Sequence, residues 1–126
     1  MAGIRKLSRF ETEWLRRFAA DIPKKDIKTY VIGFGGYIWH VFSWELLPAD
    51  SYLKGAAAMA AFDAADKTGA VCFEPYKEDA PLPAPESLTA ELLEERVECY
   101  VVAEDGSWSY IKTHEGDLCG PYFIRK

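Results

Sequence analysis

The chain has 126 residues, of which 49% are hydrophobic and 14% aromatic, so it is too apolar for a disordered protein and of the usual size for one domain. Residues 1–28 carry eight Lys or Arg against four Asp or Glu, whereas residues 29–126 carry seven against sixteen. Because the acidic residues 29–126 repel phosphate backbones, we expect no nucleic-acid partner. From its length we expect residues 1–126 to form a single domain.

The sequence also argues against a membrane protein and a disulfide-stabilised one. Its longest apolar stretch, residues 37–44, is too short to span a bilayer, and the N-terminus has no signal-peptide pattern, so we expect a cytoplasmic protein. Cys72, Cys99 and Cys119 are odd in number and form no Cys-x-x-Cys pair. We therefore expect buried, reduced thiols and no cofactor.

The first predicted element is a helix that begins with a capping box. Ser8 and Glu11 have the spacing at which a hydroxyl and a carboxylate satisfy the first amides of a helix. Apolar residues then recur at helical spacing, and Pro23 limits the helix, which we expect to end near Asp21. The expected apolar stripe consists of Phe10, Trp14, Leu15, Phe18 and Ile22.

A glycine-rich turn over residues 33–36 is expected to lead into a central strand over residues 37–45. The strand is predicted because its residues are mostly aromatic or β-branched. Period-two geometry would put Trp39, Val41 and Ser43 on one face. His40 would lie on the other face with Ile38, Phe42 and Trp44.

The middle of the chain predicts a helix, a strand and an exposed loop. The helix would start at Pro48, have its alanine-rich body over residues 55–66 and be capped by Gly69. Residues 70–76 alternate well enough for a strand. The proline-rich residues 77–85 are expected to form an exposed loop that cannot join the interior of a sheet.

The C-terminal third predicts a short helix and an antiparallel hairpin. Ser87 would cap a helix through Glu95 whose leucines, Leu88, Leu92 and Leu93, point inward. Strands over residues 97–103 and 107–113 flank an Asp-Gly pair that suits a tight turn.

A turn at residues 116–117 and a short last strand over residues 122–124 complete the prediction, with Pro121 placing the start of that strand at an edge or a bulge. Together the elements predict an α+β fold: a single compact domain with a mixed or antiparallel sheet, a C-terminal β-hairpin and about three helices.

Several motifs along the chain resemble the bacterial domain of unknown function family numbered 4275. They are Ile38-Trp39-His40-Val41-Phe42-Ser43, then Leu53, Gly55, Ala58, Ala61, Phe62 and Asp63 at fixed spacing, then Trp108-Ser109-Tyr110, Thr113-His114-Glu115 and Gly120-Pro121-Tyr122-Phe123. The resemblance implies no activity, substrate or cofactor. It implies only that a set of residues belongs to the family pattern: His40, Ser43, Thr113, His114, Glu115 and Tyr122.

The two histidines allow a functional and a structural interpretation. In the functional one, His40 and His114 converge with Glu115, Asp117 and Cys119 to form a base or a metal site. In the structural one, which we favour, His40 is a core histidine satisfied by a backbone carbonyl or by Ser43, and Thr113-His114-Glu115 stabilises a turn.

We therefore expect a non-enzymatic module that binds another protein, such as an immunity or accessory protein for a basic partner, because an acidic body complements a basic surface. The candidate binding residues are Trp39, His40, Ser43, Trp108, Tyr110, Thr113, His114, Glu115 and Tyr122. Trp108 and Tyr110 would act as interface anchors if they are exposed. The alternative is a hydrolase or metal-binding domain that uses His40, His114 and Glu115.

Overall fold

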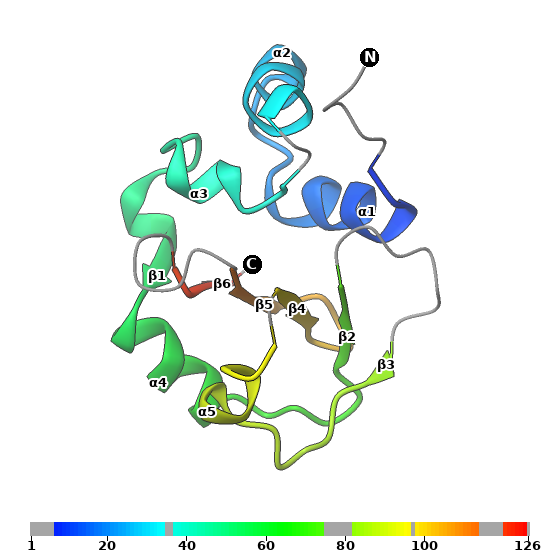
Figure 1. Cartoon of the computed structure of the whole chain (residues 1–126), viewed down its shortest axis with the longest axis vertical. Coiled ribbons are helices and arrows are strands. Elements are labelled where there is room, and N and C mark those ends of the chain that lie inside the picture. The colour runs from blue at the N-terminus through cyan, green and yellow to red at the C-terminus, as the bar shows by residue number, and fades with distance from the viewer. Residues whose placement is uncertain (1–6, 35–36, 75–81, 97, 114–119, 126) are drawn as a thin grey trace.

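A six-stranded antiparallel sheet forms the centre of the computed structural model (Figure 1), which describes residues 7–34, 37–74, 82–96, 98–113 and 120–125. The strand order is β1-β6-β5-β4-β2-β3. The strands are β1 Tyr52–Lys54, β2 Val71–Phe73, β3 Leu82–Pro83, β4 Cys99–Val102, β5 Trp108–Lys112 and β6 Tyr122–Arg125. The helices are α1 Arg9–Phe18, α2 Lys24–Asp26, α3 His40–Ser43, α4 Ala56–Ala64 and α5 Ala90–Leu93. The predicted α+β fold with an antiparallel sheet is confirmed, with more helices than the expected three.

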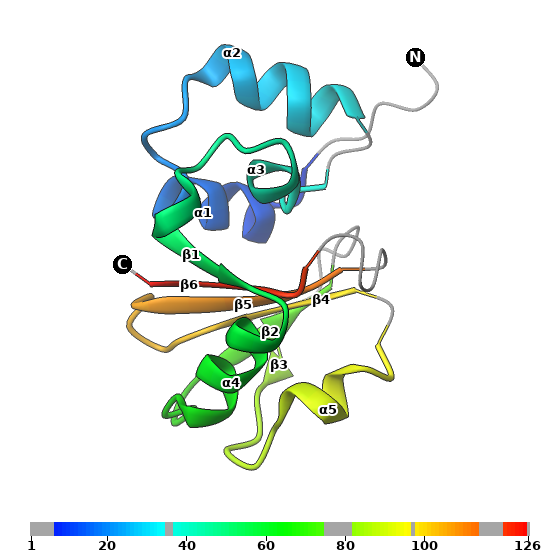
Figure 2. The same ribbon diagram turned by 90° about the vertical axis from the view of Figure 1, so that its left-hand side faces the viewer.

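Helices cover both faces of the sheet. Figure 2 shows α1, α2 and α3 on one side and α4 and α5 on the other. The strands alternate accordingly: Tyr100 and Ile111 pack in the core beneath α1 and α3, whereas Val101 and Tyr110 pack in the core against α4 and α5. Two-sided burial explains why β4, β5 and β6 are apolar in almost every position.

The predicted start of α1 is confirmed, and its end lies earlier than expected. The Ser8 hydroxyl accepts from the Glu11 amide, and the Glu11 carboxylate accepts from the Ser8 amide at 3.0 Å. Glu11 is fully buried. The helix ends at Phe18 because Ala19 leaves helical geometry, with φ -131°. The chain then turns, and Ile22 is buried before Pro23.

The predicted central strand over residues 37–45 is wrong, since His40–Ser43 forms the short helix α3. The Trp44 amide donates to the His40 carbonyl at 2.9 Å. Ile38 and Phe42 are buried on the inner side of this segment. A short apolar run bounded by turns suits a buried helix as well as a buried strand, and periodicity does not separate the two. Residues 35 and 36 of the expected glycine turn lie outside the described part.

The predicted helix starting at Pro48 is also wrong, because strand β1 separates a 3₁₀ turn at Ala49–Ser51 from α4. Tyr52 pairs with Ile124 of β6, and its ring lies 4.8 Å from that of Phe42. These contacts with β6 and Phe42 hold residues 52–54 in a strand despite the local preference for a helix. Gly55 then adopts φ +65° at the start of α4.

The C-terminal end of α4 is capped by a lysine, whereas the sequence predicted Gly69. The Lys67 ammonium, 4% exposed, donates to the carbonyls of Asp63 and Ala65 at 3.4 and 3.2 Å. It also lies 4.5 Å from the centre of the Phe62 ring. A cation at this end complements the helix dipole, although burial lowers the pKa of Lys67.

The strand predicted over residues 70–76 is confirmed at its centre by β2. The described end of the expected exposed loop forms the two-residue strand β3, which lies at the sheet edge beside β2. This agrees with the expectation that the proline-rich segment does not enter the sheet interior.

Helix α5 is shorter than predicted and is capped by Thr89 in place of Ser87. The Thr89 hydroxyl accepts from the Leu92 amide at 3.2 Å. Leu93 is buried as predicted, but Leu92 is 54% exposed.

The predicted C-terminal hairpin is confirmed by β4 and β5, with Gly106 at φ +72° in the turn. The last strand, β6, is also confirmed, but it is not an edge strand, because it lies between β1 and β5. Pro121 directly precedes it, and the Pro121 carbonyl accepts from the Gly55 amide at 2.8 Å.

Exposed acidic residues are more numerous around α4 and α5 than around α1–α3, where Glu13, Asp21 and Glu45 are exposed beside basic residues. The basic residues Lys24, Lys25 and Lys28 are exposed on the α1–α3 side. The exposed acidic residues of α4, α5 and their connections are Asp63, Asp66, Glu86, Glu91, Glu94 and Glu95. In the described part, no helix is long and apolar enough to cross a membrane.

One buried side-chain bond ties α1 to the sheet and supports a first prediction. The Trp14 indole N–H donates to the Ser109 hydroxyl at 2.8 Å, and that hydroxyl donates to the Val101 carbonyl at 2.8 Å. Ser109→Ala should reduce the free energy of unfolding by about 1–3 kcal/mol, because it leaves a buried donor unsatisfied. Urea denaturation measures this loss.

A double-mutant cycle supplies the control for that prediction. Trp14→Phe with Ser109→Ala should cost less than the two single losses together, because Phe has no N–H to satisfy. Strictly additive losses would show that the bond contributes nothing.

A second prediction concerns the cap of α5. Thr89→Ala should cost about 0.5–2 kcal/mol in urea denaturation, because it removes the acceptor of a helix amide. Ser87→Ala, at the exposed position that the sequence favoured, should stay within about 0.5 kcal/mol of the parent. The reverse ranking would mean that Ser87 is the cap.

Candidate functional site

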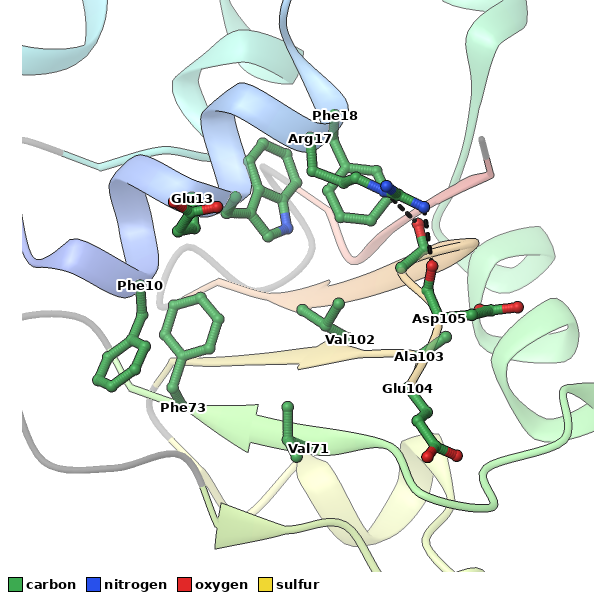
Figure 3. Close-up of a pocket in the computed structure, with 12 residues that line it drawn as sticks. Phe10, Glu13, Arg17, Phe18, Val71, Phe73, Val102, Ala103, Glu104 and Asp105 are labelled. Atoms are coloured by element: carbon green, nitrogen blue, oxygen red, sulfur yellow. Dashed lines mark hydrogen bonds between the residues drawn. The ribbon is translucent and has the colours of Figure 1, made fainter.

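An open groove with a volume of about 370 Å³ lies between α1 and the sheet. We call it the α1 groove (Figure 3). Its residues are Phe10, Glu13, Trp14, Arg17, Phe18, Val71, Phe73, Val102, Ala103, Glu104, Asp105 and Gly106. Its size and apolar lining suit the binding of one or two large side chains or of a small ligand.

The floor of the α1 groove comes from two paired strands. Val71 and Val102 are cross-strand neighbours in β2 and β4, both are half-buried, and Figure 3 shows them pointing toward α1. Phe73 closes one end, where its ring lies 5.8 Å from that of Phe10. The groove therefore exposes aliphatic surface between aromatic walls.

Arg17 fixes α1 to the hairpin at the opposite end. Its guanidinium donates to the carbonyls of Asp105 and Gly106 at 2.7 and 3.0 Å. A Cβ at position 106 would lie 2.6 Å from the Arg17 Nε, and the positive φ there also favours glycine. Arg17 and the Trp14–Ser109 bond hold the groove open without a ligand.

Two carboxylates, Glu104 and Asp105, lie at this end of the groove, and Glu13 lies toward the Phe10 end (Figure 3). Hydrogen bonds from the Ser107 side chain and amide lower the pKa of Asp105, which stays ionised at neutral pH. Glu13 pairs with Arg16 at 2.6 Å. Within the described residues, Glu104 has neither a hydrogen bond nor an ion pair, and its carboxylate lies against the backbone of Gly69 beside the groove.

None of the sequence-predicted site residues that the structure describes lines this groove. Trp39 instead reaches a buried carboxylate: its indole N–H donates to Glu98 Oε1 at 3.1 Å, and the Tyr100 hydroxyl donates to Glu98 Oε2 at 3.1 Å. Glu98 is only 6% exposed. Two donors from different elements compensate part of the cost of burying this group.

Trp39, Glu98 and Tyr100 form a group that we call the Glu98 cluster. It lies beside residues from two of the family motifs, Trp39 and Thr113. Glu98 directly precedes β4, and Thr113 directly follows β5; because Cys99 pairs with Lys112, both lie at the same end of the hairpin. Trp39 approaches that end from α3. Glu98 falls in the strand predicted over residues 97–103, but no local pattern links it to Trp39, which lies 59 residues away in the sequence.

The main contact of His40 is with a backbone carbonyl, as expected if the residue is structural. Its Nδ1 lies 2.8 Å from the Tyr30 carbonyl, which can only accept, so Nδ1 carries a proton. Its ring makes edge contacts with those of Trp39 and Trp44, at 4.6 and 6.3 Å. Ser43 is half-buried at the end of α3.

Trp108 and Tyr110 are buried, which removes them as interface anchors. Tyr110 is 1% exposed and stacks on Phe62 at 4.3 Å, and burial raises its pKa. Trp108 is 5% exposed in the same core. Tyr122 is buried in the other core and stacks on Phe42 at 4.4 Å.

The remaining candidates stay predictions. His114, Glu115, Asp117 and Cys119 lie outside the described residues. In the part of the chain that the structure covers, no three His, Cys, Asp or Glu side chains are grouped to hold a metal ion.

The comparisons with known proteins support the family resemblance. A family model described as a domain of unknown function (DUF4275) matches residues 4–123. No curated protein and no solved structure matches the chain. The family description assigns no chemistry, so the site has to be understood from its geometry.

The Glu98 cluster supports a third prediction. Trp39→Phe should reduce the free energy of unfolding by about 1–3 kcal/mol, because the buried carboxylate loses a donor. Trp44→Phe, at a position that is 46% exposed, serves as the control and should cost less than about 1 kcal/mol. Equal losses in thermal or urea unfolding would show that the Trp39–Glu98 bond is not specifically stabilising.

Proposed function

Because the chain belongs to the DUF4275 family, whose description names no activity, we propose from its own geometry that it is a protein-binding module. Its docking site is the α1 groove. The occupant is a partner segment that presents one large apolar side chain next to a Lys or Arg.

The shape of the α1 groove is the observation that carries this proposal. Both walls are held by interactions within the chain, so little ordering is needed when a ligand enters. Burying a Leu, Phe or Met side chain there would contribute about 1.5–3 kcal/mol. A single anchor of this kind is typical of the residues that dominate protein interfaces.

The charge at the hairpin end favours a basic residue beside the anchor. Glu104 carries a charge without a partner in the described structure, and Asp105 stays ionised. The guanidinium of Arg17 is directed at backbone carbonyls. The net negative charge of residues 29–126 would also attract a basic partner over longer distances.

The groove lining favours binding over catalysis. Its described residues include no His, Cys, Ser or Lys side chain, so this lining has no hydroxyl or thiol nucleophile and no imidazole base; its ionisable acids are Glu13, Glu104 and Asp105. The hydrolase alternative therefore draws no support from the groove.

The fourth prediction tests the groove with a defined probe. A six-residue peptide with one Phe between two Lys residues is titrated into ¹⁵N-labelled protein. Amide shifts should change at Val71, Val102 and Ala103. Replacing the probe's Phe by Ala, or filling the groove with Val102→Trp, should weaken binding at least about tenfold, which corresponds to the loss of one buried side chain.

Two further variants separate shape from charge. Glu104→Gln should weaken binding of the Lys-containing peptide several-fold and reduce the salt dependence of that binding. Leu92→Trp introduces the same aromatic side chain at an exposed position on the other side of the sheet and should leave binding unchanged. Shifts confined to α4 and α5, or equal binding of a peptide with Glu in place of Lys, would refute the proposal.

A further inference from the structure

Strand β1 leaves one edge of the sheet open. It is the terminal strand on its side of the sheet and pairs with β6 alone. Figure 2 shows β1 unobstructed, between the α1–α3 layer and α4. Leu53 is 42% exposed, and Lys54 is exposed beside it. The outer edge of β1 is therefore within reach of another strand.

The register of β1 determines which of its backbone groups point outward. When the β1–β6 register is continued by one residue, Gly55 stands opposite Pro121, and its amide donates to the Pro121 carbonyl at 2.8 Å. Hydrogen-bonded and non-hydrogen-bonded pairs alternate along an antiparallel ladder, so Leu53 also bonds to β6. The amides and carbonyls of Tyr52 and Lys54 then point away from the sheet. No hydrogen bond among the described residues uses these two donors and two acceptors.

The open edge is complementary to itself. A second copy of β1 can run antiparallel to the first, with the two Leu53 residues opposite each other. Tyr52 of each copy then exchanges two hydrogen bonds with Lys54 of the other copy. The four bonds satisfy every outward group of both strands and are related by a two-fold axis, which is the symmetry of most homodimers.

The Leu53 side chain also favours this register. It pairs with Phe123, which packs in the core beneath α4 and α5, so Leu53 lies on that face of the sheet. A hollow of about 290 Å³ beside it is lined by Leu53, Phe123 and Arg125, among others. Opposed side chains of a non-hydrogen-bonded pair have Cβ atoms about 4.5–5.5 Å apart. Leu53 of a second copy would therefore contact Leu53 and partly fill this hollow.

The charges on the other face of β1 complement each other in the same arrangement. Burial raises the pKa of Tyr52, and the nearby Glu45 carboxylate raises it further. Antiparallel pairing places Lys54 of one copy beside Tyr52 of the other, and so near its Glu45. Within the described part of the chain, neither Glu45 nor Lys54 forms a salt bridge. Opposite charges at such a contact favour one register over others.

We propose that two copies of this chain associate through β1 and join their sheets across a two-fold axis at Leu53. The paired segment is only three residues long in each copy, so the dimer is expected to be weak. The α1 groove lies at the opposite end of the sheet, on β2 and β4. The pairing therefore leaves both grooves of the dimer open.

Sedimentation equilibrium between about 10 µM and 1 mM protein tests the association. The average mass should rise from that of a monomer toward that of a dimer. Leu53→Lys, which sets two like charges opposite each other, should raise the dissociation constant at least about tenfold. Leu82→Lys makes the same change at an exposed position of β3, the other edge strand, and should have no effect.

A charge exchange tests the register. Glu45→Lys and Lys54→Glu should each weaken the dimer several-fold, because each brings like charges together. The double variant, in which the two charges are exchanged, should restore association. Urea unfolding of each variant shows that the monomer stays folded.

Cross-linking gives a second measurement of the register. In a non-hydrogen-bonded pair the Cα atoms are about 4.5 Å apart, which a disulfide can span. Leu53→Cys should therefore form a disulfide between two copies under mild oxidation, and peptide mass spectrometry should locate it at position 53. Leu82→Cys should form no such link.

Three results would overturn the inference: a protein that stays monomeric at about 1 mM, a dimer that survives Leu53→Lys unchanged, or a charge exchange that fails to restore association. Val102→Trp, which fills the α1 groove, should leave the dimer unchanged. Failure of peptide docking and failure of self-association are therefore separate outcomes.

Discussion

The burial of β4, β5 and β6 on both faces is the constraint on which the rest of the structure depends. Strands of this kind cannot be stable in water alone, because neither face is polar. They require one helical layer above and another below. The N-terminal segments through α3 supply the first layer, and α4 and α5 supply the second.

Two-sided burial also determines how polar groups are tolerated inside the protein. Ser109 lies in the middle of β5 with 0% exposure, yet its hydroxyl both accepts from Trp14 and donates to a backbone carbonyl. Glu98 at the start of β4 receives donors from Trp39 and Tyr100. Both of these buried polar groups thus link the sheet to the layer above it, and each orients an aromatic ring while doing so.

Local signals in the sequence were sufficient where the physical cause is local. The capping box at Ser8 and the Asp-Gly turn of the hairpin depend on neighbouring residues, and both were predicted correctly. The segment around His40 has a pattern that suits either secondary structure, and its helical form depends on packing over the sheet. Strand β1 exists because β6 offers it a partner, which no local pattern reports.

The candidate site was less predictable than the fold for a similar reason. Aromatic residues at Trp108 and Tyr110 look like interface anchors in sequence, but the side to which each strand residue points decides their burial. The groove combines residues from α1, β2 and the hairpin, which lie far apart along the chain. Glu98 was overlooked because its partner Trp39 lies 59 residues away in the sequence.

Strand β2 is only three residues long, yet its side chains point alternately to both faces of the sheet. Val71 and Phe73 line the groove, and Cys72 faces the opposite core. A single-residue insertion or deletion between Gly69 and Val71 would reverse this order: the thiol would turn into the groove, and bulky apolar side chains would replace it beside Cys99. The length of that short connection therefore decides which face of the sheet each side chain of β2 reaches.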